Sequence, residues 1–168
     1  MIQHPVPEKL LIQIGDITVS FALLESTIRL LTGSLVAEHQ RIGQIITAEL
    51  AFKNLRAMTV SLYKERHGED EDFSTLRHLM QRAAKLEEIR NQITHSLWGA
   101  GSAADTITRI KTTAKEKQGI RFQFQQIRES DLADIAQKMK RLAGDVQAFW
   151  IRLIDTAKAI NNPVMKAW

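Results

Sequence analysis

An unbroken apolar repeat near the N-terminus constrains the fold more than any other feature of the sequence. Apolar residues recur there at alternating intervals of four and three positions, at Leu10, Ile14, Ile17, Phe21, Leu24, Ile28, Leu31 and Leu35. This spacing follows one face of an α-helix and is typical of helices that pack antiparallel in bundles. The sequence therefore predicts a helix over residues 8–36, preceded by Pro7, whose missing N–H costs little at a helix start.

Three further stretches have helical periodicity, and they are predicted to cover residues 39–66, 74–98 and 131–160. The apolar side of the second helix would consist of Ile42, Ile46, Leu50, Ala57, Val60 and Tyr63. Gly68 ends the second helix, the glycine-rich segment 99–102 ends the third, and Ser130 is the expected cap of the last. The predicted fold class is therefore all-α, as an up-and-down four-helix bundle.

The segment at about 105–128 has a different pattern and is predicted to form a small β-hairpin inserted before the last long helix. Residues 106–113 are rich in β-branched side chains, and residues 120–125 alternate apolar and polar. The alternation predicts that Ile120, Phe122 and Phe124 pack down while Arg121 points out. The segment holds six Lys or Arg against two acidic residues, so its net charge of +4 equals that of the whole chain.

Composition bounds the class of protein. A chain of 168 residues with 44% apolar and 25% charged residues fits a single globular domain, residues 1–168. The absence of Cys excludes disulfides and thiolate metal sites, and no His and carboxylate spacing suggests a metal or another cofactor. The N-terminus lacks a signal-peptide pattern and no apolar run approaches ~18 residues, so we expect a cytoplasmic protein without a membrane partner.

The residues best suited to chemistry are Arg90, Asn91 and His95, near the end of the third predicted helix. Histidine changes its charge near neutral pH, and arginine has the geometry to bind phosphate. Together they can transfer a proton and stabilise an anion, which is what RNA cleavage without a metal requires.

Helical geometry places these residues relative to the core. At about 100° per residue, Asn91 and His95 share a face, and His95 falls opposite the core stripe. Arg90 falls at the edge of that stripe, where it needs a carboxylate, and either Glu25 or Glu49 could supply one. Trp98 would lie on the same side of the helix as His95. A large ring there predicts a second buried surface, and hence a homodimer through the third helix.

The string Arg90-Asn91-Gln92-Ile93-Thr94-His95 resembles the motif of the HEPN superfamily, named for its occurrence in higher eukaryotes and prokaryotes. The family pattern is Arg, four to six residues and His, often with a polar residue after the Arg, in a compact α-helical bundle. Many members are metal-independent endoribonucleases that act as toxins, anti-phage effectors or RNA-processing enzymes, with active sites where two domains meet. Some toxins carry a Tyr that an antitoxin modifies two residues after the His, where this chain has Leu97.

The resemblance implies a metal-independent endoribonuclease with Arg90, Asn91 and His95 as catalytic residues. Its partners would be RNA, a second copy of the chain and possible antitoxin or regulatory proteins. The basic residues of the hairpin are candidate RNA-binding residues: Arg109, Lys111, Lys115, Lys117 and Arg121. Two alternatives remain open, namely a non-catalytic dimeric module that binds RNA or protein, and a structural bundle whose motif is accidental.

Overall fold

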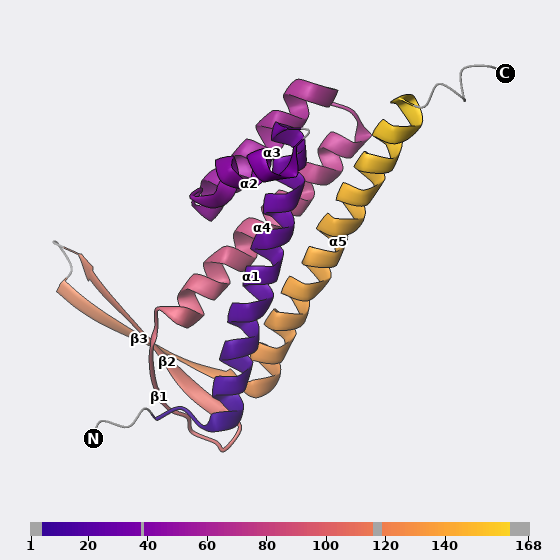
Figure 1. The fold of residues 1–168 in the computed structure, drawn as a ribbon. Helices are drawn as coiled ribbons and strands as arrows, with labels where there is room; N and C mark the ends of the chain where they lie inside the picture. The colour runs from indigo at the N-terminus through magenta and orange to yellow at the C-terminus, as the bar shows by residue number, and fades with distance from the viewer. Residues whose placement is uncertain (1–4, 38, 116–118, 162–168) are drawn as a thin grey trace. The chain divides into compact units, whose positions relative to one another are not determined.

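The computed structural model describes residues 5–37, 39–115 and 119–161, and this part of the chain is mostly helical (Figure 1). Its helices are α1 (Glu8–Val36), α2 (Gln40–Ala48), α3 (Phe52–His67), α4 (Glu71–Thr94) and α5 (Glu129–Asn161). The strands β1 (Leu97–Ala100), β2 (Thr106–Lys115) and β3 (Gly119–Arg128) form one antiparallel sheet in the order β1-β2-β3. The prediction of a mostly helical chain with a β-hairpin before the last long helix is confirmed.

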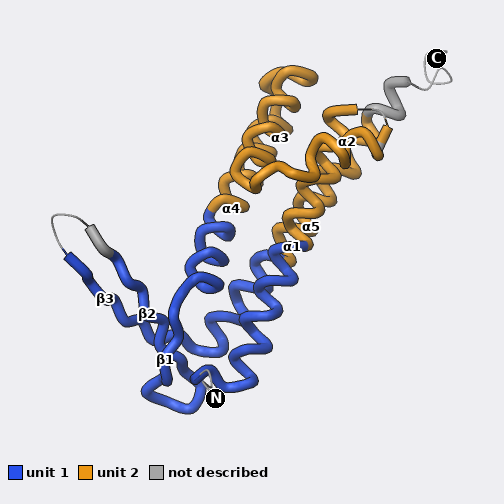
Figure 2. The backbone as a smooth tube through the Cα atoms, turned by 60° about the vertical axis from the view of Figure 1, so that its left-hand side comes forward, with its two compact units in different colours: residues 1–22, 85–139 blue, residues 23–84, 140–168 orange. Residues whose placement is uncertain are grey.

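The chain divides into two compact units (Figure 2). The first combines residues 1–22 with residues 85–139, and the second combines residues 23–84 with residues 140–168. Helices α1, α4 and α5 each have one segment in the first unit and one segment in the second. The first unit holds the whole sheet and the Arg90–His95 motif. The expectation of a single domain remains a prediction.

Helix α1 has the predicted bounds and the predicted core face. Of the eight apolar positions in its repeat, all but Ile14 are at most 2% exposed. The other side of the helix is also apolar, since Ile12, Val19 and Leu23 are 62%, 69% and 53% exposed. By length and composition α1 could cross a membrane, although a core helix of a soluble protein meets the same test.

The second predicted helix is interrupted between Ala48 and Phe52, so that this part of the chain forms two helices, α2 and α3. The Arg29 guanidinium donates hydrogen bonds to the carbonyl oxygens of Thr47 and Leu50, the latter at 3.0 Å, and forms an ion pair with Glu25 at 2.7 Å. The last carbonyls of a helix lack intrahelical donors, so the hydrogen bonds from Arg29 stabilise the break between the two helices.

The break also changes which residues are buried. Helix α2 contacts α1 through glycine, since a Cβ atom on Gly43 would lie 2.6 Å from the carbonyl oxygen of Gly33. Ile42 and Ile46, which the sequence places on the apolar side of one long helix, are 47% and 44% exposed and do not belong to the core. In α3 the buried positions are Phe52, Leu55, Thr59 and Tyr63.

Helix α4 begins at Glu71, three residues earlier than expected, because Asp70 caps it. The Asp70 carboxylate accepts the backbone N–H of Phe73 at 2.7 Å and the Tyr63 hydroxyl at 3.1 Å. Burial and this carboxylate raise the pKa of the Tyr63 phenol, which therefore stays a hydrogen-bond donor.

Helix α4 also ends earlier than expected, because the chain enters β1 instead of continuing as a helix to Trp98. Strand β1 pairs with β2 from Leu97 opposite Ile110 to Ala100 opposite Ile107. A Cβ atom on Gly101 would collide with the backbone of Thr106, so this turn requires glycine. Helix α5 begins at Glu129, with the Asp131 carboxylate rather than Ser130 accepting the Arg128 N–H at 3.0 Å.

Replacing the α4 cap tests this account of the helix boundary. Asp70→Ala should lower the free energy of unfolding by about 1–2 kcal/mol, because the Phe73 N–H and the Tyr63 hydroxyl both lose their acceptor. Urea denaturation followed by circular dichroism measures the change. Glu69→Ala is the matched control, because it removes only an exposed ion pair with Lys64. An equal loss in both variants would contradict the capping role.

Candidate functional site

The end of α4 presents His95 to solvent. His95 directly follows the last helical residue, and its backbone N–H still donates to the carbonyl oxygen of Asn91 at 3.1 Å. The imidazole is exposed and the Asn91 side chain is half-buried. The two residues are thus one helical turn apart, as the sequence predicts, and an approaching ligand can reach the imidazole.

Arg90 has a different environment from the one expected. Its guanidinium carbon lies 4.3 Å from the centre of the Phe21 ring, so the cation stacks on an aromatic face of α1. Its Nε atom is buried and has no hydrogen-bond partner within the described residues. Of the two carboxylates expected to pair with it, Glu25 pairs with Arg29, and Glu49 directly follows the last residue of α2.

Arg90 and His95 point in different directions from the same helix. Five residues correspond to about 140° around a helix axis. Phe21 holds the side chain of Arg90 on one side, whereas His95 is free on another. The structure therefore brings Asn91 and His95 together, but one copy of α4 does not present Arg90 and His95 to the same atom.

The sheet is tied to the same end of α4 by a hydrogen bond. Arg109 of β2 donates from Nη1 to the Gln92 side-chain oxygen at 2.8 Å, and the Gln92 amide donates to Glu88 at 3.3 Å. Trp98, which pairs with Arg109 across the β1–β2 ladder, donates from its ring nitrogen to the Ile93 carbonyl at 3.2 Å. Both contacts come from the same face of the sheet.

Strand alternation gives the sheet two faces of opposite character. The face that contacts α4, here called the inner face, carries Trp98, Ile107, Arg109, Lys111, Arg121 and Ile127. The opposite face, here called the outer face, carries Leu97, Ile110, Ile120, Phe122 and Phe124. Ile107 and Ile127 of the inner face are buried, so that face provides the packing at the base of the hairpin.

The predicted orientation of the hairpin is wrong. Ile120, Phe122 and Phe124 are 66%, 59% and 69% exposed, although the sequence predicts that they pack against the bundle. An alternating strand shows which residues share a face but not which of its faces is covered. Here the face that carries most of the basic residues is covered at its base, at Ile107 and Ile127, and both faces of β3 are exposed beyond it.

The basic residues are only partly where the sequence places them. Lys111 and Arg121 are exposed on the inner face, opposite Gln123 and Thr113 respectively, and Arg109 is half-buried against Gln92. The Lys115 backbone belongs to β2, but its side chain and the whole of Lys117 lie outside the described residues. The sequences of β2 and β3 contain no acidic residue, so positive charge on this face has no neutralising partner within these strands.

Trp98 does not lie beside His95 on a helix, because it belongs to β1 and is half-buried. The prediction of a homodimer through α4 used this ring as its anchor, and that argument no longer holds. Leu97, the neighbouring residue, is 67% exposed on the outer face.

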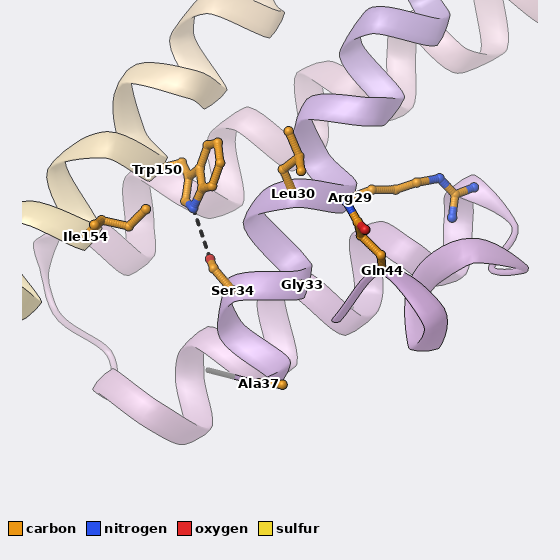
Figure 3. A pocket seen from close by; sticks show the side chains of 8 residues that line it. All are labelled: Arg29, Leu30, Gly33, Ser34, Ala37, Gln44, Trp150 and Ile154. Carbon is orange, nitrogen blue, oxygen red and sulfur yellow. Dashed lines mark hydrogen bonds between the residues drawn. The ribbon is translucent and has the colours of Figure 1, made fainter. Parts of the chain in front are cut away.

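The second unit contains a separate cavity of about 310 Å³ lined by residues of α1, α2 and α5 (Figure 3). Trp150 and Ser34 are neighbours in this lining, and the indole nitrogen donates to the Ser34 hydroxyl at 3.1 Å. Among the described residues, the cavity lining contains no histidine or carboxylate. Within the described part of the chain, no group of three or more His, Cys, Asp or Glu side chains is arranged to hold a metal ion.

Comparisons of the chain with protein-family models, with curated proteins and with solved structures give no match. The assignment of a function therefore depends on the residues of this chain and their geometry.

Two residues at the site were not singled out by the sequence. Phe21 looks like one more core position of α1, and only the structure shows it under the Arg90 guanidinium. Gln92 lies inside the motif but carries no chemical signal, and its role depends on Arg109, 17 residues further along the chain. Neither contact has a local signal that could have predicted it.

A double-mutant cycle tests the environment of Arg90. Arg90→Met and Phe21→Leu should each destabilise the protein, and their effects should couple by about 1 kcal/mol because each removes the same cation–π contact. Chemical denaturation of the four proteins gives the coupling energy. The control cycle uses Arg77→Met and Phe73→Leu, where the distance is 5.9 Å and Arg77 is exposed, and it should couple more weakly. Equal coupling in both cycles would contradict a specific role for the Arg90 contact.

Proposed function

We propose that this protein is a metal-independent endoribonuclease of the HEPN type and that the end of α4 is its active site. The observation that supports this most strongly is the exposed imidazole of His95, one turn from Asn91, at a helix end to which a basic strand face is tied by the Arg109–Gln92 hydrogen bond. A titratable group beside a phosphate-binding surface is the minimum that RNA cleavage requires.

The proposed reaction starts with attack of a ribose 2′-oxygen on the adjacent phosphorus. His95 acts as general base on the 2′-hydroxyl proton, or as general acid toward the departing 5′-oxygen. The new bond joins phosphorus to the 2′-oxygen, and the bond to the 5′-oxygen breaks. The products are a 2′,3′-cyclic phosphate and a 5′-hydroxyl, so DNA is not a substrate.

Asn91 and the basic strand face have binding roles in this proposal. The Asn91 amide, on the same side of the helix as His95, orients the substrate or the imidazole. Lys111 and Arg121 attract the phosphate backbone without reading sequence, because Lys and Arg contacts to phosphate are electrostatic.

Arg90 is the residue whose proposed role needs a second copy of the chain. Arg90 and His95 of one helix diverge by about 140°, so they cannot readily contact one phosphate together. A homodimer would allow the Arg90 of one copy to stabilise the charge on a phosphate that the partner's His95 serves. The same proposal includes a cytoplasmic location and a role as a toxin or anti-phage effector. An antitoxin or another regulatory protein would then be a further partner.

The alternative function is a non-catalytic binding module of the same fold. The exposed apolar outer face of the sheet favours it, because contiguous apolar surface commonly marks a docking site. The two functions differ in whether His95 is needed for a chemical step.

His95→Ala should abolish cleavage of total RNA in EDTA, with a loss of at least about 100-fold, because the general acid–base group is gone. The assay is gel or capillary electrophoresis of the RNA after timed incubation. His78→Ala is the matched control, since His78 is also exposed and on the same helix but lies 17 residues earlier. The helical circular dichroism of both variants should equal that of the wild type. Equal activity of His95→Ala and wild type would exclude the catalytic role, and activity that requires an added metal would exclude the proposed reaction.

A further inference from the structure

The outer face of the sheet exposes a contiguous apolar surface from Leu97 toward the end of the hairpin, whereas its base, at Thr106 and Thr108, is buried. Leu97, Ile110 and Phe124 lie directly opposite one another in a row across β1, β2 and β3. Phe122 and Ile120 continue this surface along β3 toward the end of the hairpin. Four of these five side chains are between 59% and 69% exposed, and Ile110 is half-buried.

Hydrogen bonds hold this face as a regular sheet at its base. Thr108 donates to the Ala100 carbonyl at 2.7 Å, and the Gln126 amide donates to Thr108 at 2.7 Å, so three strands are joined on this side. The ladder between β2 and β3 is continuous from Thr106 opposite Arg128 to Lys115 opposite Gly119. The apolar residues therefore project from a preformed surface, which a partner can cover with little ordering cost.

We propose that the outer face is an interface between two copies of this chain, packed face to face about a two-fold axis. A two-fold contact requires a self-complementary surface, and this surface is, at its described positions, apolar or uncharged from Leu97 to Ile120. Arg109, Lys111 and Arg121 lie on the reverse side, and Arg128, which is on the outer face, lies at its base opposite Thr106. Two sheets packed by their outer faces at about 10 Å would keep both basic faces outside the pair, where salt screens their repulsion.

The available area suits a weak dimer. Large apolar side chains bury on the order of 150–200 Å² each, so four that are about two-thirds exposed leave roughly 400–500 Å² per copy. Two copies would then bury about 800–1,000 Å², with more from the half-buried and polar rim. This lies near the lower limit for specific protein interfaces, so we expect an equilibrium that shifts with protein concentration in the micromolar range.

The same interface leaves His95 and the basic inner face of each copy exposed. It places the two α4 ends on opposite sides of the pair, so it is not the contact that would bring the Arg90 of one copy to the partner's His95. Lys111 and Arg121 remain accessible on the inner faces, and Leu97 is two residues from His95 along the chain. The inference holds whether or not the protein cleaves RNA, since it uses none of the residues proposed for catalysis.

Sedimentation velocity of the nuclease-treated full chain tests the proposal. The wild type should shift from monomer to dimer with rising concentration, and Phe122→Ser with Phe124→Ser should raise the dissociation constant at least ten-fold. The matched control, Gln123→Ser with Gln125→Ser, changes exposed residues of the same strand on the inner face and should leave dimerisation unchanged. A wild type that stays monomeric, or equal weakening by both pairs, would overturn the proposal.

The absence of cysteine allows a second, independent measurement. Phe124→Cys should be crosslinked into a dimer by a short bismaleimide much faster than Gln125→Cys, because only the first residue faces the partner. Similar crosslinking of the two variants would contradict face-to-face packing.

Binding of a single-stranded oligouridylate tests whether the outer face binds RNA bases instead of a second copy of the chain. If the wild type is monomeric and the phenylalanine pair alone weakens that binding, the outer face stacks RNA bases and the proposed dimer is wrong.

Discussion

The hydrogen bond between Arg109 and Gln92 is the interaction on which the candidate site depends. It joins β2 to the last turns of α4, and with the Trp98 hydrogen bond to the Ile93 carbonyl it attaches the inner face of the sheet to this helix. With that face turned inward, His95 is left exposed at the helix end and the phenylalanines of β3 are left exposed on the reverse side. The proposed active site and the proposed dimer surface are thus two consequences of one packing choice.

That choice conflicts with the usual separation of apolar and basic residues. A hairpin with one apolar and one basic face would ordinarily bury the apolar face. Here Ile107 and Ile127 supply enough apolar contact at the base for the inner face to pack there, while Lys111 and Arg121 lie further along the same face. The remaining apolar side chains are available for a partner, and exposed surface of this kind is uncommon without a function.

Sequence periodicity predicts the elements whose cause is local. Helix α1 follows from its repeat at every position but Ile14, and the hairpin follows from β-branched and alternating residues. The break between α2 and α3 could not be predicted, because it depends on Arg29, which is 18 residues before Thr47. The early end of α4 depends on strand pairing of Leu97 with Ile110, and no residue near position 95 encodes it.

The candidate site shows the same division. The spacing of Asn91 and His95 predicts their common side, because one helical turn is a local property. The partner of Arg90 was expected to be a carboxylate, but it is the ring of Phe21, because tertiary packing rather than spacing decides which residue lies under a guanidinium. The roles assigned to these residues in cleavage rest on their chemistry and on the resemblance of the motif.

The chemical identity of the RNA ends tests the central claim most directly. An oligonucleotide cut by the wild-type protein in EDTA should yield a 2′,3′-cyclic phosphate and a 5′-hydroxyl by mass spectrometry. A single 2′-deoxy substitution at the cut nucleotide should block cleavage there, because the attacking oxygen is missing. Products with a 5′-phosphate, or undiminished cleavage at the substituted position, would show that water rather than the 2′-oxygen attacks, and would contradict the reaction proposed for His95.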